Sequence, residues 1–102
     1  MQGIELISFE IISSVGMARS CFIEAMRKAR EGLFEDAQSL IKEGEGYFIE
    51  GHRAHTRLIQ LEATGEPLVL TILLTHAQDQ LMSAEGFKII AEEFIHTYQK
   101  MN

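Results

Sequence analysis

Arg30-Glu31-Gly32-Leu33 and Thr64-Gly65-Glu66-Pro67 are the two places in this 102-residue chain where turn residues coincide with a break in the spacing of apolar residues. In the first, glycine suits the left-handed position that follows the C-terminus of a helix. In the second, proline is tolerated at the first position of a helix, where its missing N–H has no partner to lose. These breaks predict three helices, which we expect at about residues 5–31, 34–63 and 67–100.

Apolar residues recur at three- and four-residue steps along these segments, as in helices with one buried face. In the first segment this stripe comprises Ile7, Ile11, Val15, Ala18, Phe22, Ala25 and Ala29. Gly44, Gly46 and Gly51 weaken the second segment, where we expect a bend or fraying. Because short loops between long helices make neighbours antiparallel, we predict an all-α, up-down-up three-helix bundle, with residues 1–102 forming a single domain.

The third segment has two apolar faces. One stripe suits the interior of the bundle and comprises Leu70, Leu74, Ala77, Leu81, Ala84, Ala91 and Ile95. The second set points almost the opposite way and comprises Leu68, Ile72, Met82, Gly86 and Ile90. A helix that is apolar on two sides of a small bundle needs a second burial surface, so we expect the chain to self-associate. The spacing alone fits a dimer as well as a trimer.

Composition narrows the function classes. Nine basic against fifteen acidic side chains give a formal charge of −6, and no Lys/Arg-rich stripe is present, so we do not expect nucleic-acid binding. The single cysteine, Cys21, fits a reducing compartment and a small core residue. There is no signal-peptide pattern and no continuous apolar run of about 18 residues. We therefore expect a soluble, cytoplasmic protein.

The run Leu73-Leu74-Thr75-His76-Ala77-Gln78-Asp79-Gln80-Leu81-Met82 contains the best candidate for chemistry. At about 100° per residue, Asp79 lies only about 60° around the helix from His76. One face therefore carries a nucleophile that can be neutral near pH 7 and a carboxylate. A bare HxxD pattern would be a weak signal, because it occurs by chance in many helices.

The whole block is stronger, because it resembles LLxHAQDxLM, the signature of the lactose/cellobiose-type enzyme IIA of the bacterial sugar phosphotransferase system. Residues 11–20 (IISSVGMARS) are similar to the first-helix pattern of that family, and further matching blocks extend over nearly the whole chain. The resemblance implies that Nε2 of His76 accepts phosphate from the phosphocarrier protein HPr and passes it to a cysteine of enzyme IIB. The membrane would be involved only indirectly, through the IIC transporter.

The same resemblance implies a trimer of three-helix bundles. In such a trimer the Asp79 side chains of the subunits would share one Mg²⁺, an oxygen-preferring cation that offsets the repulsion between converging carboxylates. A carboxylate capped by a neighbouring Gln or Lys, without metal, is the alternative for Asp79.

Supporting roles are less well defined by the sequence. Gln78 matches the motif and could hydrogen-bond near the metal, and His52 matches a family position from which it could orient His76, although structural roles are open for both. The most relevant departure is Gln80, where the family commonly has a second histidine; Gln donates hydrogen bonds but carries no charge. Leu33 stands where the family usually has an N-cap aspartate.

Two other functions compete with that of a phosphocarrier. A histidine phosphotransfer module of a two-component relay is disfavoured, because its HxxKG pattern would need Lys and Gly where Asp79 and Gln80 stand. A non-catalytic helical oligomer or regulatory relative, in which loss of the second histidine marks lost transfer, stays open. The disaccharide, of lactose/cellobiose type, cannot be specified, because this component passes phosphate and need not touch the sugar.

Overall fold

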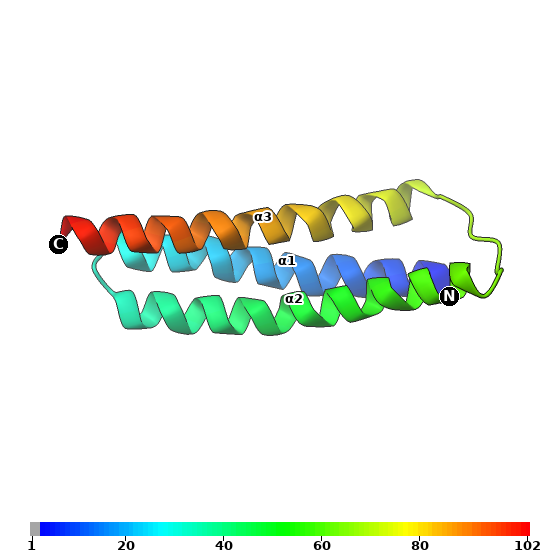
Figure 1. The fold of residues 1–102 in the computed structure, drawn as a ribbon, viewed down its shortest axis with the longest axis horizontal. Coiled ribbons are helices and arrows are strands. Elements are labelled where there is room, and N and C mark those ends of the chain that lie inside the picture. The colour runs from blue at the N-terminus through cyan, green and yellow to red at the C-terminus, as the bar shows by residue number, and fades with distance from the viewer. Residues whose placement is uncertain (1–2) are drawn as a thin grey trace.

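The computed structural model describes residues 3–102, which form three long helices: α1 (Gly3–Arg30), α2 (Phe34–Ala63) and α3 (Ile72–Met101). Consecutive helices run antiparallel and lie side by side in a rod of 54 × 20 × 20 Å (Figure 1). No strand occurs within the described residues. The predicted all-α, up-down-up three-helix bundle is confirmed.

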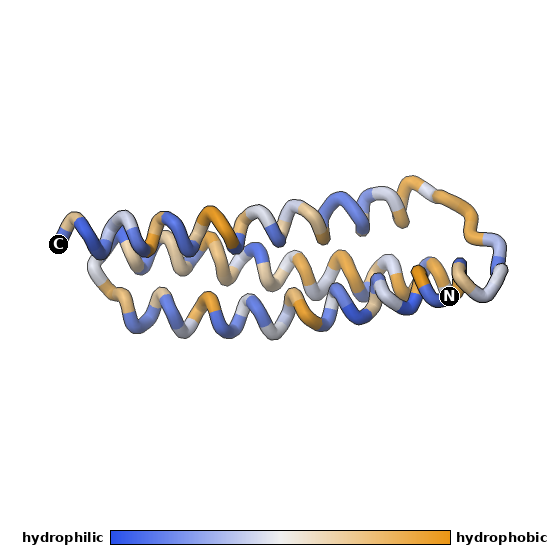
Figure 2. The backbone as a smooth tube through the Cα atoms, viewed as in Figure 1, coloured by the Kyte–Doolittle hydropathy of each residue, from blue (hydrophilic) through white to orange (hydrophobic). Residues whose placement is uncertain are grey.

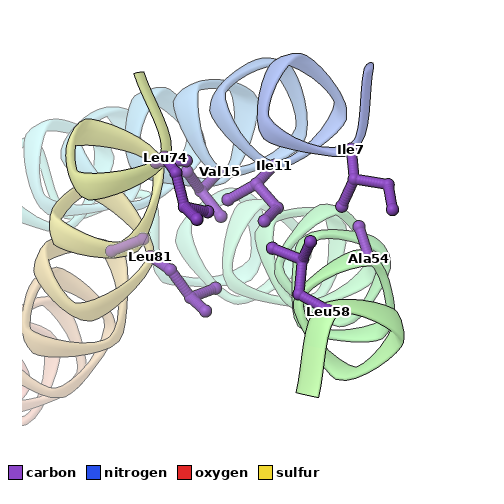
Figure 3. Packing of buried hydrophobic residues seen from close by; sticks show 9 residues of the cluster. Ile7, Ile11, Val15, Ala54, Leu58, Leu74 and Leu81 are labelled. Carbon is purple, nitrogen blue, oxygen red and sulfur yellow. The ribbon is translucent and has the colours of Figure 1, made fainter. Parts of the chain in front are cut away.

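The core runs the length of the rod, because each helix turns its apolar stripe inward. Figure 3 shows one half, where Ile11 and Val15 of α1, Leu58 of α2, and Leu74 and Leu81 of α3 point toward one another. A second cluster fills the other half around Phe22, which has no exposed surface. Helix α1 contributes more of these side chains than α2 and slightly more than α3. It is long and apolar enough to cross a membrane by length and composition, and its packing against both α2 and α3, which contact each other much less, identifies it as the central helix of the bundle.

The turn between α1 and α2 forms as its glycine predicts. Gly32 has φ +81°, its N–H donates to the carbonyl of Ala29 at 3.0 Å, and the N–H of Leu33 donates to the carbonyl of Lys28 at 2.9 Å. These bonds are those of a Schellman motif, which satisfies the last carbonyls of a helix. Leu33 is also the N-cap of α2, where its side chain makes no capping hydrogen bond.

The predicted start of the third helix at Pro67 is wrong. Helix α3 begins at Ile72, and residues 67–71 form an extended connection, the apolar loop at the right of Figure 2. Thr71 is the N-cap, and its hydroxyl accepts a hydrogen bond from the N–H of Leu74 at 3.0 Å. This bond and the β-branched Val69 favour extended backbone before the cap. Leu70, placed in the core stripe by the sequence, is consequently 72% exposed, and Leu68 lies outside the helix.

Helix α2 is continuous across its glycines, so the expected fraying does not occur. Two of them are buried because α1 approaches closely there. A Cβ on Gly44 would lie 2.5 Å from Cε1 of Phe22, and a Cβ on Gly51 would lie 2.6 Å from Cγ1 of Val15. Gly46 faces open space instead. The glycines therefore let α1 and α2 pack closely rather than interrupting the helix.

Candidate functional site

His76 lies in the second turn of α3, and its side chain is exposed. The capping bond of Thr71 fixes where the helix starts and therefore which way His76 projects. His76 and Asp79 border a shallow hollow of about 450 Å³ that also includes Leu70, Thr71, Ile72 and Thr75. The imidazole is thus accessible to a second protein.

Two hydrogen bonds show which edge of α3 lies beside α1 and which lies beside α2. Nη1 of Arg19 donates to Oε1 of Gln80 at 2.7 Å, so the edge carrying Gln80 faces α1. His76 precedes Gln80 by four residues and lies about 40° from it around the helix, on this same edge. Gln78 lies about 160° from His76, and its Nε2 is 3.2 Å from Nε2 of His55 on α2. Since the amide nitrogen can only donate, that ring nitrogen of His55 accepts.

Within one chain, the structure brings only part of the predicted site together. Gln80 adjoins His76, whereas Gln78 lies at the α2 edge. His52 is exposed on α2, and its ring lies tilted at 38° to that of Phe48, with centroids 6.3 Å apart. It makes no hydrogen bond to His76 within residues 3–102. A role for His52 or Gln78 at His76 would therefore need a second subunit.

Asp79 is exposed on the outward face of α3, between the α1 and α2 edges. Around it, Ile72 is 90% exposed, Met82 75% and Ile90 50%, so the second apolar face predicted from the sequence is uncovered in the single chain. Among residues 3–102, no three His, Cys, Asp or Glu side chains gather as a metal site would require. Asp79 offers the oxygen ligand that Mg²⁺ prefers, but a metal site would have to include carboxylates of other copies.

Arg19 is the residue at this site that sequence reasoning did not single out. It appeared only within the first-helix block, with no role. Arg19 directly follows the buried Ala18, so it lies on the flank of the core stripe of α1. That position is the one feature of the sequence that could have indicated a contact with a neighbouring helix. Contact with α3 could not be deduced, because it depends on how the two helices are rotated about their axes.

Comparison with known proteins agrees with this fold and with the family that the sequence resembles. Residues 6–99 match the family described as PTS system, Lactose/Cellobiose specific IIA subunit. The lactose-specific EIIA component of Staphylococcus aureus is 36% identical over 97 residues, which cover 95% of this chain and 94% of that protein.

Two solved structures are also similar. The cellobiose-specific enzyme IIA of Bacillus anthracis is 40% identical with a TM-score of 0.96, covering 99% of this chain and 93% of that one. The IIA(chitobiose) component in a complex with HPr is 25% identical with a TM-score of 0.86, covering 99% and 98%. This chain therefore belongs to the lactose/cellobiose-specific IIA family of the sugar phosphotransferase system.

Proposed function

We propose that this protein is a phosphocarrier that accepts a phosphoryl group on His76 from phospho-HPr and passes it to a cysteine of enzyme IIB. The observation that carries the proposal is the exposed His76 of the HAQD motif, at the edge of an open hollow in a chain of the IIA family. A carrier must present its nucleophile to two different proteins in turn. An exposed side chain on a rigid helix suits that task.

The chemistry requires little beyond the imidazole and correct positioning. The lone pair of an unprotonated nitrogen of His76, which the family resemblance implies to be Nε2, attacks the phosphorus of phosphohistidine on HPr. A new P–N bond forms while the P–N bond to HPr breaks, and the departing imidazole takes up a proton. In the second step the thiolate of IIB attacks the same phosphorus, the P–S bond forms, and the imidazole of His76 leaves in the same way.

The partners follow from the relatives. A IIA(chitobiose) component has been solved with HPr, which supports HPr as the donor for this chain. We propose cytoplasmic localisation, with the membrane reached only through IIB and the IIC transporter. The relatives are named for lactose, cellobiose and N,N'-diacetylchitobiose, so the substrate of the system is proposed only as a disaccharide of lactose/cellobiose type.

We further infer that the working unit is a homotrimer. The uncovered apolar side chains of Ile72, Met82 and Ile90 supply an interface of the expected kind, and Asp79 stands among them. Three Asp79 carboxylates brought together would hold one Mg²⁺, which supplies the positive charge that offsets their repulsion. The metal is proposed as part of the assembly and takes no part in phosphoryl transfer.

Incubation with HPr phosphorylated from labelled phosphoenolpyruvate and enzyme I tests the function. Wild type should acquire acid-labile, base-stable label, and His76→Ala should acquire none while retaining its helical circular-dichroism signal. His96→Ala, which changes another exposed histidine of α3, is the matched control and should be labelled like wild type. Labelling of His76→Ala at His52 or His55 would overturn the assignment. An unlabelled wild type would favour the non-catalytic relative.

A further inference from the structure

The guanidinium of Arg19 is held at the edge of α3 that carries His76. Both Arg19 and Gln80 are half-buried, and Nη1 donates to Oε1 of Gln80 at 2.7 Å. The ion pairs within residues 3–102 join other residues: Arg27 with Glu24, Arg57 with Glu10, and Lys88 with Glu45. Arg19 thus has a neutral partner, and it forms no ion pair within residues 3–102.

Gln80 brings this charge close to His76. Residues four apart on a helix have Cβ atoms about 5–6 Å from each other, so the partner of Arg19 is the immediate neighbour of the candidate phosphate acceptor. A guanidinium presents five N–H donors in a planar fork, and the bond to Gln80 uses one of them. The remaining donors suit the oxygens of a phosphoryl group, which arginine binds in bidentate fashion.

A cation at this site would offset the negative charge that phosphorylation adds. Phosphorylation adds a charge of about −1.5 to −2 to a protein whose formal charge is already −6. The added charge would also lie near Asp79, about 60° around the same helix. A guanidinium at this edge offsets both sources of repulsion and stabilises the charge on the transferring group.

We propose that Arg19 binds the phosphoryl group on His76, and that Gln80 is the positioning residue that aims the guanidinium. This inference rests on the proposed function and adds a residue to its site. It also changes the interpretation of Gln80. The sequence suggested that replacing the second histidine removes electrostatic help, whereas in this chain the positive charge comes from α1 through a neutral amide.

Initial rates of transfer from phospho-HPr test the proposal in Arg19→Gln, Arg19→Lys and Gln80→Ala. Loss of the guanidinium should slow transfer by roughly 100- to 1000-fold, because one preorganised charge-stabilising donor is removed. Lysine should restore part of the rate. Arg27→Gln is the matched control on the same helix, because it removes an equal charge from an exposed position about 12 Å further along, and it should transfer like wild type.

Two readouts separate a role at phosphate from a general effect on folding. The phosphorus NMR shift of phosphorylated His76 should move in Arg19→Gln and stay unchanged in Arg27→Gln. Gln80→Ala should slow transfer several-fold in an otherwise wild-type chain and have little further effect in Arg19→Gln, since its action runs through the guanidinium.

The outcomes distinguish this inference from the proposed function. If wild type is labelled on His76 while Arg19→Gln matches Arg27→Gln in rate and phosphorus shift, the role of Arg19 is overturned and the phosphocarrier function stands. If wild type is not labelled, both are overturned. If Arg19→Gln loses its helical signal, the transfer rate of Gln80→Ala tests the proposal instead. An unchanged rate in that folded variant would overturn it.

Discussion

The surroundings of Cys21 make this thiol a core group rather than a reactive one. Its side chain is 8% exposed, and Sγ donates a hydrogen bond to Oε2 of Glu43 at 3.4 Å. Burial, together with the hydrogen bond and the negative charge of Glu43, raises the pKa of Cys21 from 9.0 to about 11. Because the thiolate is the nucleophile, the thiol is inert near neutral pH. Cys21 therefore offers no nucleophile that would compete with the proposed role of His76.

The raised pKa predicts how stability depends on pH. Below pH 9 the thiol is protonated in the folded and in the unfolded state, and its contribution to stability is fully present. Between pH 9 and 11 the thiol of the unfolded chain loses its proton while that of the folded chain keeps it, so stability falls as the pH rises. The expected loss is about 1.4 kcal/mol per pH unit in that range. Urea titrations from pH 8 to 11 on wild type and Cys21→Ala measure it. Equal pH slopes in the two proteins would contradict the prediction.

At the scale of the helices, the glycines of α2 have opposite roles. A Cβ at Gly44 would meet the ring of the fully buried Phe22 at 2.5 Å, whereas nothing lies within 4 Å of a Cβ at Gly46. Gly44→Ala should therefore destabilise the bundle by about 1–3 kcal/mol through overpacking. Gly46→Ala should stabilise it by up to about 1 kcal/mol, because alanine is the better helix former. Thermal unfolding of the pair measures the contrast, and equal shifts of the same sign would show that α1 does not pack against α2 as described.

The start of α2 offers a second test of local structure. Leu33 is 43% exposed at the N-cap and leaves the first N–H groups of the helix without a side-chain partner. Its ψ of 70° differs from the 166° of Thr71, which does cap, so an aspartate would need a large rotation of ψ to cap in the same way. We expect Leu33→Asp to exceed Leu33→Ala in unfolding free energy by about 0.5–2 kcal/mol. Leu33→Ala controls for the lost apolar surface, and a denaturant titration that ranks alanine above aspartate would rule out capping.

These helices also show what the sequence could predict. Gly32 and the three- and four-residue apolar steps define the end of α1 and the whole of α2, because both signals are local to the chain. The start of α3 was wrong because two local signals compete there, Pro67 as a first helical residue and Thr71 as a cap, and the cap prevailed. The His76–Asp79 face follows from spacing alone. The edge contacts of Arg19 and His55 do not, because they depend on helix rotation and on the conformations of long side chains.

At the scale of the whole molecule, α3 divides its apolar residues between two environments. Leu74, Ala77 and Leu81 are buried in the bundle, while Ile72 and Met82 are exposed on the opposite face with Asp79 between them. Exposed apolar side chains of this size on a continuous face mark an interaction surface. His76 lies at the edge of that face, so association there would border the proposed nucleophile without burying it. Assembly and phosphoryl transfer would then share one helix.

Asp79 stands at the proposed trimer axis, where its charge has two opposite effects. Replacing Asp79 with leucine removes the metal ligands, but it also removes the repulsion and the desolvation cost of the clustered carboxylates. Exchanging a buried charged cluster for packed apolar residues is often neutral or stabilising. We therefore expect Asp79→Leu to remain trimeric, to be at least as stable as wild type in chelator, and to lose any response to Mg²⁺.

Sedimentation and thermal unfolding with and without chelator measure these properties, and Asp79→Asn provides the matched control. Asparagine keeps the shape of the side chain without its charge, so Asp79→Asn should also ignore Mg²⁺, but it should gain less stability than Asp79→Leu because the amide still has to be desolvated. A monomeric Asp79→Leu would show that the carboxylate is needed for assembly. A wild-type trimer indifferent to chelator would show that no shared metal offsets the charge.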